Sequence, residues 1–97
     1  MQEFFKKVAE FQKATDQPVN IRPTSLEREY EILRFSLMKE ENEEYLDATQ
    51  ESNIVEVLDA CVDMMYVLAG TINSHGLGYI FDEAFNSSFD FLFSSER

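Results

Sequence analysis

The chain has 97 residues, 44% of them hydrophobic, and 19 acidic against 8 basic side chains give it a formal net charge of -11 at pH 7. This length predicts one domain, over residues 1–97, with a modest core. The charge excludes nucleic acid or an anionic membrane as a partner bound through a basic patch. No segment is apolar over the length that a signal peptide or a membrane span requires, and the single cysteine, Cys61, cannot form an internal disulfide. We therefore expect a soluble cytoplasmic protein.

The first half of the chain predicts two helices. Phenylalanines recur at helical spacing over residues 2–14, with charged residues between them, which indicates an amphipathic helix. Residues 15–23 contain both prolines and show no periodicity, so they are expected to form an ordered loop. Thr24 and Glu27 then fit a capping box, in which both side chains would bond to free backbone amides. A second helix is therefore predicted over residues 25–50.

The second half predicts two more helices, and no strand pattern occurs. Asn53 with Glu56 is typical of a helix start, which predicts a tight antiparallel hairpin between the second helix and a third over residues 54–72. This third helix is apolar on most of its circumference and is expected to be central. A shorter fourth helix is predicted over residues 80–93. It has more apolar surface than a small monomer easily buries, which indicates a subunit interface formed by Phe81, Phe85, Phe89, Leu92 and Phe93.

Two glutamates occupy positions of the second helix at which its apolar stripe should continue. Glu41 and Glu44 extend that stripe at steps of four and three and precede Ala48, so both are expected to point inward. An unpaired carboxylate that faces a core costs several kcal/mol or takes up a proton, so a compensating cation is expected. Acidic runs on helices are usually solvated faces, and that interpretation suits the neighbouring Glu40 and Glu43.

The third helix repeats the arrangement. Glu56 and Asp59 are three residues apart, and an antiparallel hairpin should bring them opposite the first pair. Four carboxylates without a nearby histidine or thiolate favour a hard ion, magnesium or manganese. The di-iron bundle pattern needs a Glu-x-x-His motif, whereas the only histidine, His75, lies outside both acidic segments. Asp63 could be a further ligand, a residue that orients a ligand, or a partner for Arg34.

The acidic spacing, Glu40-Glu41-x-x-Glu44 followed by Glu56-x-x-Asp59, resembles the signature of the MazG-like all-alpha nucleotide pyrophosphohydrolases. Residues 26–86 are similar to the phosphoribosyl-ATP pyrophosphohydrolase-like branch. The resemblance implies an all-α bundle of four to five helices, assembled as a homodimer or a dimer of dimers. It also implies a house-cleaning hydrolase that cleaves a nucleoside triphosphate, with ribose or deoxyribose, to the monophosphate and pyrophosphate.

Individual residues can be assigned roles in this chemistry. A magnesium ion held by Glu41, Glu44, Glu56 and Asp59 would neutralise the polyphosphate and lower the pKa of a bound water, and manganese is the alternative ion. Glu40, beside these four carboxylates, is the candidate base that would take the proton from that water.

Four further residues are candidates for binding the nucleotide. Arg34 and Lys39 are cations close to the acidic segment in sequence, although a surface position or a structural ion pair would also explain them. Tyr66 could stack on a base and Asn73 could bond to its edge. The structural alternative for Tyr66 is a position in the core, and for Asn73 it is a position at the end of the helix. A helix-end position is also expected for His75.

Two other functions stay open. Residues 87–97 lack the basic segment with which the family branch usually continues, which suggests a member that has lost or altered catalysis. An acidic helical protein could also mimic DNA and occupy a basic partner. Such mimics spread their acids over the surface, whereas the acids of this chain fall at helix-stripe positions, which favours the enzyme.

Overall fold

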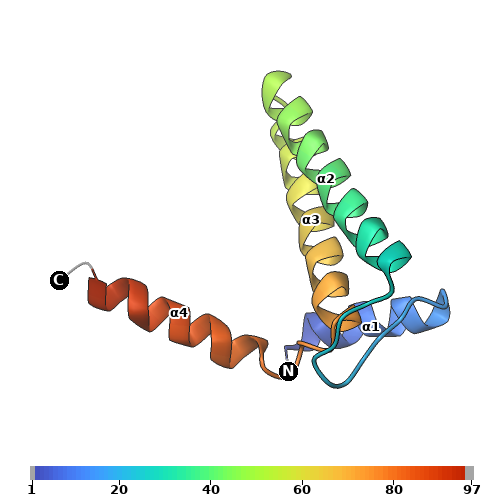
Figure 1. Ribbon diagram of the computed structural model, residues 1–97. Helices are drawn as coiled ribbons and strands as arrows, with labels where there is room; N and C mark the ends of the chain where they lie inside the picture. The colour runs from blue at the N-terminus through green and yellow to red at the C-terminus, as the bar shows by residue number, and fades with distance from the viewer. Residues whose placement is uncertain (1, 96–97) are drawn as a thin grey trace.

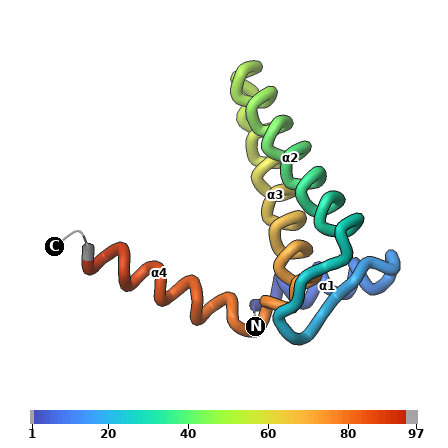
Figure 2. Tube along the Cα trace, viewed as in Figure 1, coloured from blue at the N-terminus to red at the C-terminus, as the bar shows by residue number. Residues whose placement is uncertain are grey.

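The computed structural model describes residues 2–95 of the chain. Within that range the protein is entirely helical and loop, without strands, which confirms the all-α prediction. None of these helices is long and apolar enough to cross a membrane. Figures 1 and 2 show the four helices, which are α1 (Glu3–Ala14), α2 (Arg28–Gln50), α3 (Ile54–Ser74) and α4 (Phe81–Ser95).

Helices α2 and α3 form the predicted antiparallel hairpin, which rises from α1 (Figure 1). The start of α3 is as the sequence predicts, because the Asn53 side chain accepts a hydrogen bond from the Glu56 backbone N–H at 3.2 Å. Ala48 of α2 and Ala60 of α3 are both buried in the hairpin. The pairing of α2 with α3 brings the acidic segments of the two helices together.

The predicted capping box at the start of α2 is wrong. Helix α2 begins at Arg28, no side chain caps it, and the Thr24 hydroxyl donates to the neighbouring Ser25 carbonyl. The Thr24 backbone instead bonds to the end of α3: its N–H donates to the His75 carbonyl at 2.9 Å, and its carbonyl lies 2.8 Å from His75 Nδ1. This long-range contact holds the loop extended and delays the helix by about one turn.

The apolar core lies at the base of the hairpin, where α1 crosses the end of α3. Phe5 and Val8 of α1 are buried against Ala69 and Ile72 of α3, and the first turn of α4 adds Phe81 to their edge. The rings of Phe5 and Phe81 meet edge to face with centroids 5.4 Å apart. Helix α3 is thus central, as predicted, because it contacts both α1 and α2.

A buried polar layer lies beside this core and fixes α1 on α3. Gln12 is 2% exposed, donates to the Gly70 carbonyl at 3.0 Å and to the Ser74 hydroxyl at 3.1 Å, and accepts from Asn73. Asn73 also donates to the Phe5 carbonyl. A buried polar group that is left without its partner destabilises the fold by about 1–3 kcal/mol. A shift of α1 along α3 would leave several such groups unpaired, so this layer favours one register between the two helices.

Candidate metal and substrate site

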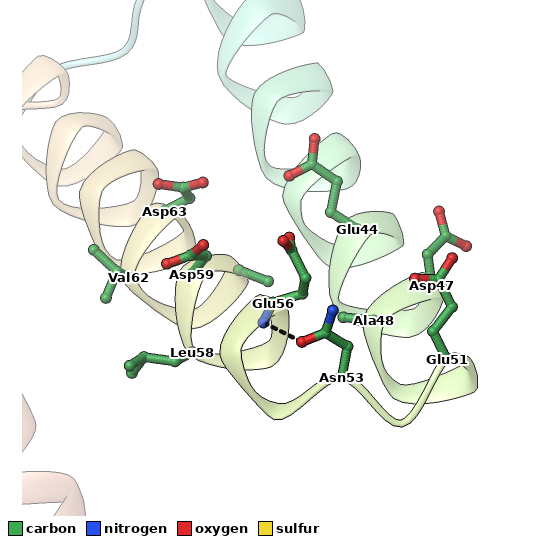
Figure 3. Close-up of a pocket in the computed structure, with 11 residues that line it drawn as sticks. Glu44, Asp47, Ala48, Glu51, Asn53, Glu56, Leu58, Asp59, Val62 and Asp63 are labelled. Atoms are coloured by element: carbon green, nitrogen blue, oxygen red, sulfur yellow. Dashed lines mark hydrogen bonds between the residues drawn. The ribbon is translucent and has the colours of Figure 1, made fainter.

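A cavity of about 670 Å³ opens between α2 and α3 near the tip of the hairpin. Figure 3 shows its lining, with carboxylates on both helices and Asn53 at the turn between them. No lysine, arginine or histidine lines this cavity. Its six acidic residues are Glu44, Asp47, Glu51, Glu56, Asp59 and Asp63.

Three carboxylates meet at the inner end of the cavity. One oxygen from each of Glu41, Glu44 and Asp63 lies within 4.8 Å of the other two. Glu44 and Asp63 are exposed, whereas Glu41 is partly buried in the hairpin. Its Oε2 atom is itself buried and has no hydrogen-bond partner among the described residues. These three residues are called the carboxylate triad below.

The electrostatics of the triad favour positive charge. The pKa of Glu41 is raised above its ordinary value, first because burial disfavours the charged carboxylate, then because of a side-chain hydrogen bond with Glu44, and then because Glu44, Asp63 and Glu40 are negative neighbours. A buried acceptor without a donor is also unfavourable by itself. Oxygen-only donors converging from two helices suit a hard divalent cation, which would supply both the charge and the missing partner of Oε2. The residues present therefore fit such an ion.

The position of Asp63 follows from the symmetry of the hairpin. Its turn is centred on Ser52, and Glu41 and Asp63 are each 11 residues from it (52 − 41 and 63 − 52). They therefore lie at one level of the two helices. Glu56 is four residues from the same centre and lies level with Ala48. The spacing of the acids around the turn could thus have selected Asp63 in advance.

The predicted quartet is therefore only partly assembled at one point. Glu41 and Glu44 meet as expected, but the third member of the close group is Asp63. Glu56 and Asp59 line the same cavity nearer its tip. Glu40 is exposed on α2 and close enough for its charge to contribute to the raised pKa of Glu41.

Arg34 does not pair with Asp63, the third of the alternatives for that residue. Its guanidinium is buried and donates to the Gln17 side-chain oxygen at 2.9 Å, the Thr71 hydroxyl at 3.2 Å and the Val67 carbonyl at 3.1 Å. All three acceptors are neutral, and burial lowers the pKa of Arg34. The Arg34 side chain therefore links α2 to α3 and to the loop after α1.

A second cavity, of about 230 Å³, contains two of the four nucleotide candidates. Arg34 of α2 and Tyr66 of α3 line it together with other residues of these two helices, of α1 and of the loop after α1. Its lining comes within one helical turn of the carboxylate triad, because Leu37 precedes Glu41 by four residues and Tyr66 follows Asp63 by three. The ring of Tyr66 is half exposed.

Lys39 and Asn73 lie elsewhere. Lys39 is exposed on α2 and lines a separate apolar groove of about 460 Å³ with Phe35, Met38 and Met64. Asn73 is 4% exposed, and its amide donates within the polar layer described above. His75 holds the loop before α2 at the end of α3, as a helix-end residue.

Two comparisons with known proteins found similar sequences. The sequence model of the family described as Phosphoribosyl-ATP pyrophosphohydrolase matches residues 8–87, which include the carboxylate triad and both cavities. An uncharacterized protein of Acanthamoeba polyphaga mimivirus is 45% identical over 49 residues, which are 50% of this chain. That alignment spans only 17% of the viral protein, so the chain corresponds to a small part of it.

Proposed function

The chain belongs to the phosphoribosyl-ATP pyrophosphohydrolase family, and from this premise we propose that it hydrolyses a nucleoside triphosphate to the monophosphate and pyrophosphate. The bond broken would be the phosphoanhydride between the α and β phosphates. The observation that carries this proposal is the partnerless buried oxygen of Glu41 beside Glu44 and Asp63, because a cation bound there would satisfy that oxygen and could hold a polyphosphate.

Glu41, Glu44 and Asp63 are proposed to hold magnesium, or alternatively manganese. Such an ion, when bound, would neutralise phosphate charge and make a water more acidic. Glu56 and Asp59, further along the cavity, would bind a second ion or orient waters around the first. Glu40 is the proposed base, since it is exposed next to the triad and can accept a proton from the attacking water.

The nucleoside is proposed to occupy the second cavity. Tyr66 offers a half-exposed ring for stacking on a base. The lining of the cavity is mostly apolar, which suits a heterocycle. Arg34 would act mainly by fixing the wall of this cavity, with its remaining N–H donors directed to the ligand. Lys39 would attract phosphate from outside, and Asn73 would position α1. We further propose that the protein works in the cytoplasm as a homodimer or homotetramer.

The decisive experiment is a panel of ribo- and deoxyribonucleoside triphosphates, incubated with magnesium and monitored for pyrophosphate. Glu41→Gln and Asp63→Asn should each lower turnover by about 100-fold or more, since each removes a charge at the site where the phosphates bind. Glu51→Gln, on the same cavity but outside the triad, is the matched control and should retain most activity. Circular dichroism would verify that all variants stay helical.

Absence of turnover with every triphosphate would contradict the proposed activity. If calorimetry then still showed magnesium binding that Asp63→Asn weakened, the chain would be a family member that keeps its ion and has lost catalysis. Full activity of Asp63→Asn together with an inactive Glu56→Gln would instead restore the quartet first expected from the sequence.

A further inference from the structure

The guanidinium of Arg34 carries more hydrogen-bond donors than the protein uses. Arg34 is 6% exposed, and three of its five N–H groups donate to the neutral oxygens described above. The other two N–H groups belong to the terminal nitrogens Nη1 and Nη2, one on each. No carboxylate of the described residues forms an ion pair with this side chain. A buried cation that lines a cavity with unused donors is unfavourable unless a ligand accepts from it.

The oxygens near this guanidinium already accept hydrogen bonds. The side-chain oxygen of Gln17 and the backbone carbonyl of Val67 accept from Arg34 itself. The side-chain oxygen of Gln12, which belongs to the same cavity lining, accepts from Asn73. The guanidinium has no acceptor to offer. This end of the second cavity therefore presents mainly N–H donors to a ligand.

The position of Arg34 relative to the carboxylate triad indicates which part of a nucleotide reaches it. Arg34 precedes Glu41 by seven residues, which is roughly 10 Å along α2. Tyr66 follows Asp63 by only three residues, roughly 5 Å along α3. A nucleotide whose phosphates lie at the triad would therefore pass Tyr66 before its far end meets Arg34. That far end is the edge of the base, and the mostly apolar lining favours a heterocycle over a hydrated phosphate.

Gly70 of α3 leaves the space in which the guanidinium lies. A Cβ atom at this position would be 2.8 Å from Arg34 Nη2 and 3.3 Å from both Arg34 Cζ and Gln12 Nε2. Any other residue would therefore displace the guanidinium from the cavity wall. Glycine inside a helix is unfavourable compared with alanine, so its use at this point fits a need for space. Gly70 itself lines the second cavity.

We propose that Arg34, positioned by Gly70, selects bases that present a carbonyl oxygen to this end of the cavity. These oxo bases are guanine, hypoxanthine, uracil and thymine, and the rejected amino bases are adenine and cytosine. The inference rests on the proposed function, in which a nucleoside triphosphate binds with its base in the second cavity. A carbonyl oxygen accepts from the unused N–H groups, as guanine does from arginine in nucleic-acid recognition. An amino group would instead set donors against donors and leave both sides unpaired.

Two pairs of nucleotides, assayed with magnesium and the full chain, test this selection. Inosine and adenosine triphosphate form one pair, and uridine and cytidine triphosphate form the other. Each pair has the same sugar, phosphates and ring size, and differs in the oxo or amino group and the adjoining ring nitrogen. The oxo nucleotide should have the higher kcat/KM in both pairs, by about tenfold or more.

Two substitutions should reduce this preference by about fivefold or more, mainly by raising KM for the oxo nucleotides. Arg34→Lys keeps the charge and removes the planar pair of donors, whereas Gly70→Ala keeps the arginine and displaces it. Arg28→Lys is the matched control, because Arg28 is exposed on the same helix, and it should keep the preference. A general loss of folding or of the ion lowers turnover of all four nucleotides alike, so the ratio within each pair isolates the role of Arg34.

The absence of an oxo preference in both pairs would overturn the inference, and so would a preference that both substitutions leave unchanged. No turnover of any nucleotide would contradict the proposed hydrolysis by itself. Calorimetry with the same four triphosphates and magnesium would then measure the same ratios as Kd values. Tighter binding of the oxo nucleotides would uphold the selection without catalysis, whereas equal Kd values within both pairs, or no binding at all, would overturn it.

Discussion

Glu41 destabilises the metal-free fold when it is ionised. Its pKa is raised in the folded state, so the folded protein holds the proton more tightly than the unfolded chain does. Its contribution to stability is therefore fully present below the unfolded pKa of a glutamate and is lost as pH rises through the higher, folded pKa. The free energy of unfolding should fall across that interval, which begins near the ordinary glutamate pKa of 4.5.

Urea denaturation of the metal-free protein and of Glu41→Gln, at a series of pH values, checks this prediction. The variant should become more stable relative to the unmodified protein as pH rises. Glu43→Gln is a suitable control because Glu43 is an exposed glutamate on the same helix. Parallel stability curves for Glu41→Gln and the unmodified protein would show that the raised pKa has no thermodynamic consequence.

The apolar stripe of α2 predicts an inward position for both Glu41 and Glu44. Glu41 is partly buried, whereas Glu44 is exposed, so the inward position predicted for Glu44 is wrong. Spacing along a single helix leaves the role of Asp63 open, because Asp63 meets Glu41 only across the turn. The hydrogen bonds of Arg34 are likewise not visible in local sequence. The three acceptors of Arg34 lie 17 to 37 residues from it in sequence and reach it only in the folded chain.

The starts of α2 and α3 give a prediction at the scale of elements. Asn53 satisfies a free amide of α3, so Asn53→Ala should lower the free energy of unfolding by about 1 kcal/mol. Thr24→Ala removes a hydroxyl that bonds only to the Ser25 carbonyl in an exposed loop, so it should cost less than about 0.5 kcal/mol. The two values come from urea unfolding at constant m. A loss at Thr24 equal to that at Asn53 would mean that the capping box forms after all.

These two helix starts show when local sequence determines an element. The Asn53 cap involves residues three apart, and no distant contact competes with it. The Thr24 pattern was equally typical, yet a bond to His75, 51 residues away, holds the backbone in another conformation. The direction of α4 is of the second kind, because it depends on Phe5 and Gln2 at the opposite end of the chain.

At the scale of the whole molecule, the all-α class and the central position of α3 followed from periodicity and apolar content. The way in which the chain buries its apolar surface did not follow from these patterns. Most of its fully buried residues lie at the base, around α1 and the end of α3, while much of the hairpin and of α4 remains exposed. A pattern of apolar residues shows that a face is to be covered, and it does not specify whether the cover comes from the same chain.

The distance between the core and the carboxylate triad has one more consequence. The core holds the base of the hairpin, whereas the site lies toward its tip, where little beyond Ala48 and Ala60 is buried. That tip should open on its own, without global unfolding. An ion that bridges α2 and α3 there would stabilise the closed tip. The affinity for the ion and the equilibrium between the closed and the open tip would therefore be coupled. Hydrogen–deuterium exchange should record it: adding magnesium should slow amides of residues 44–63 about tenfold or more and leave those of residues 66–74 unchanged.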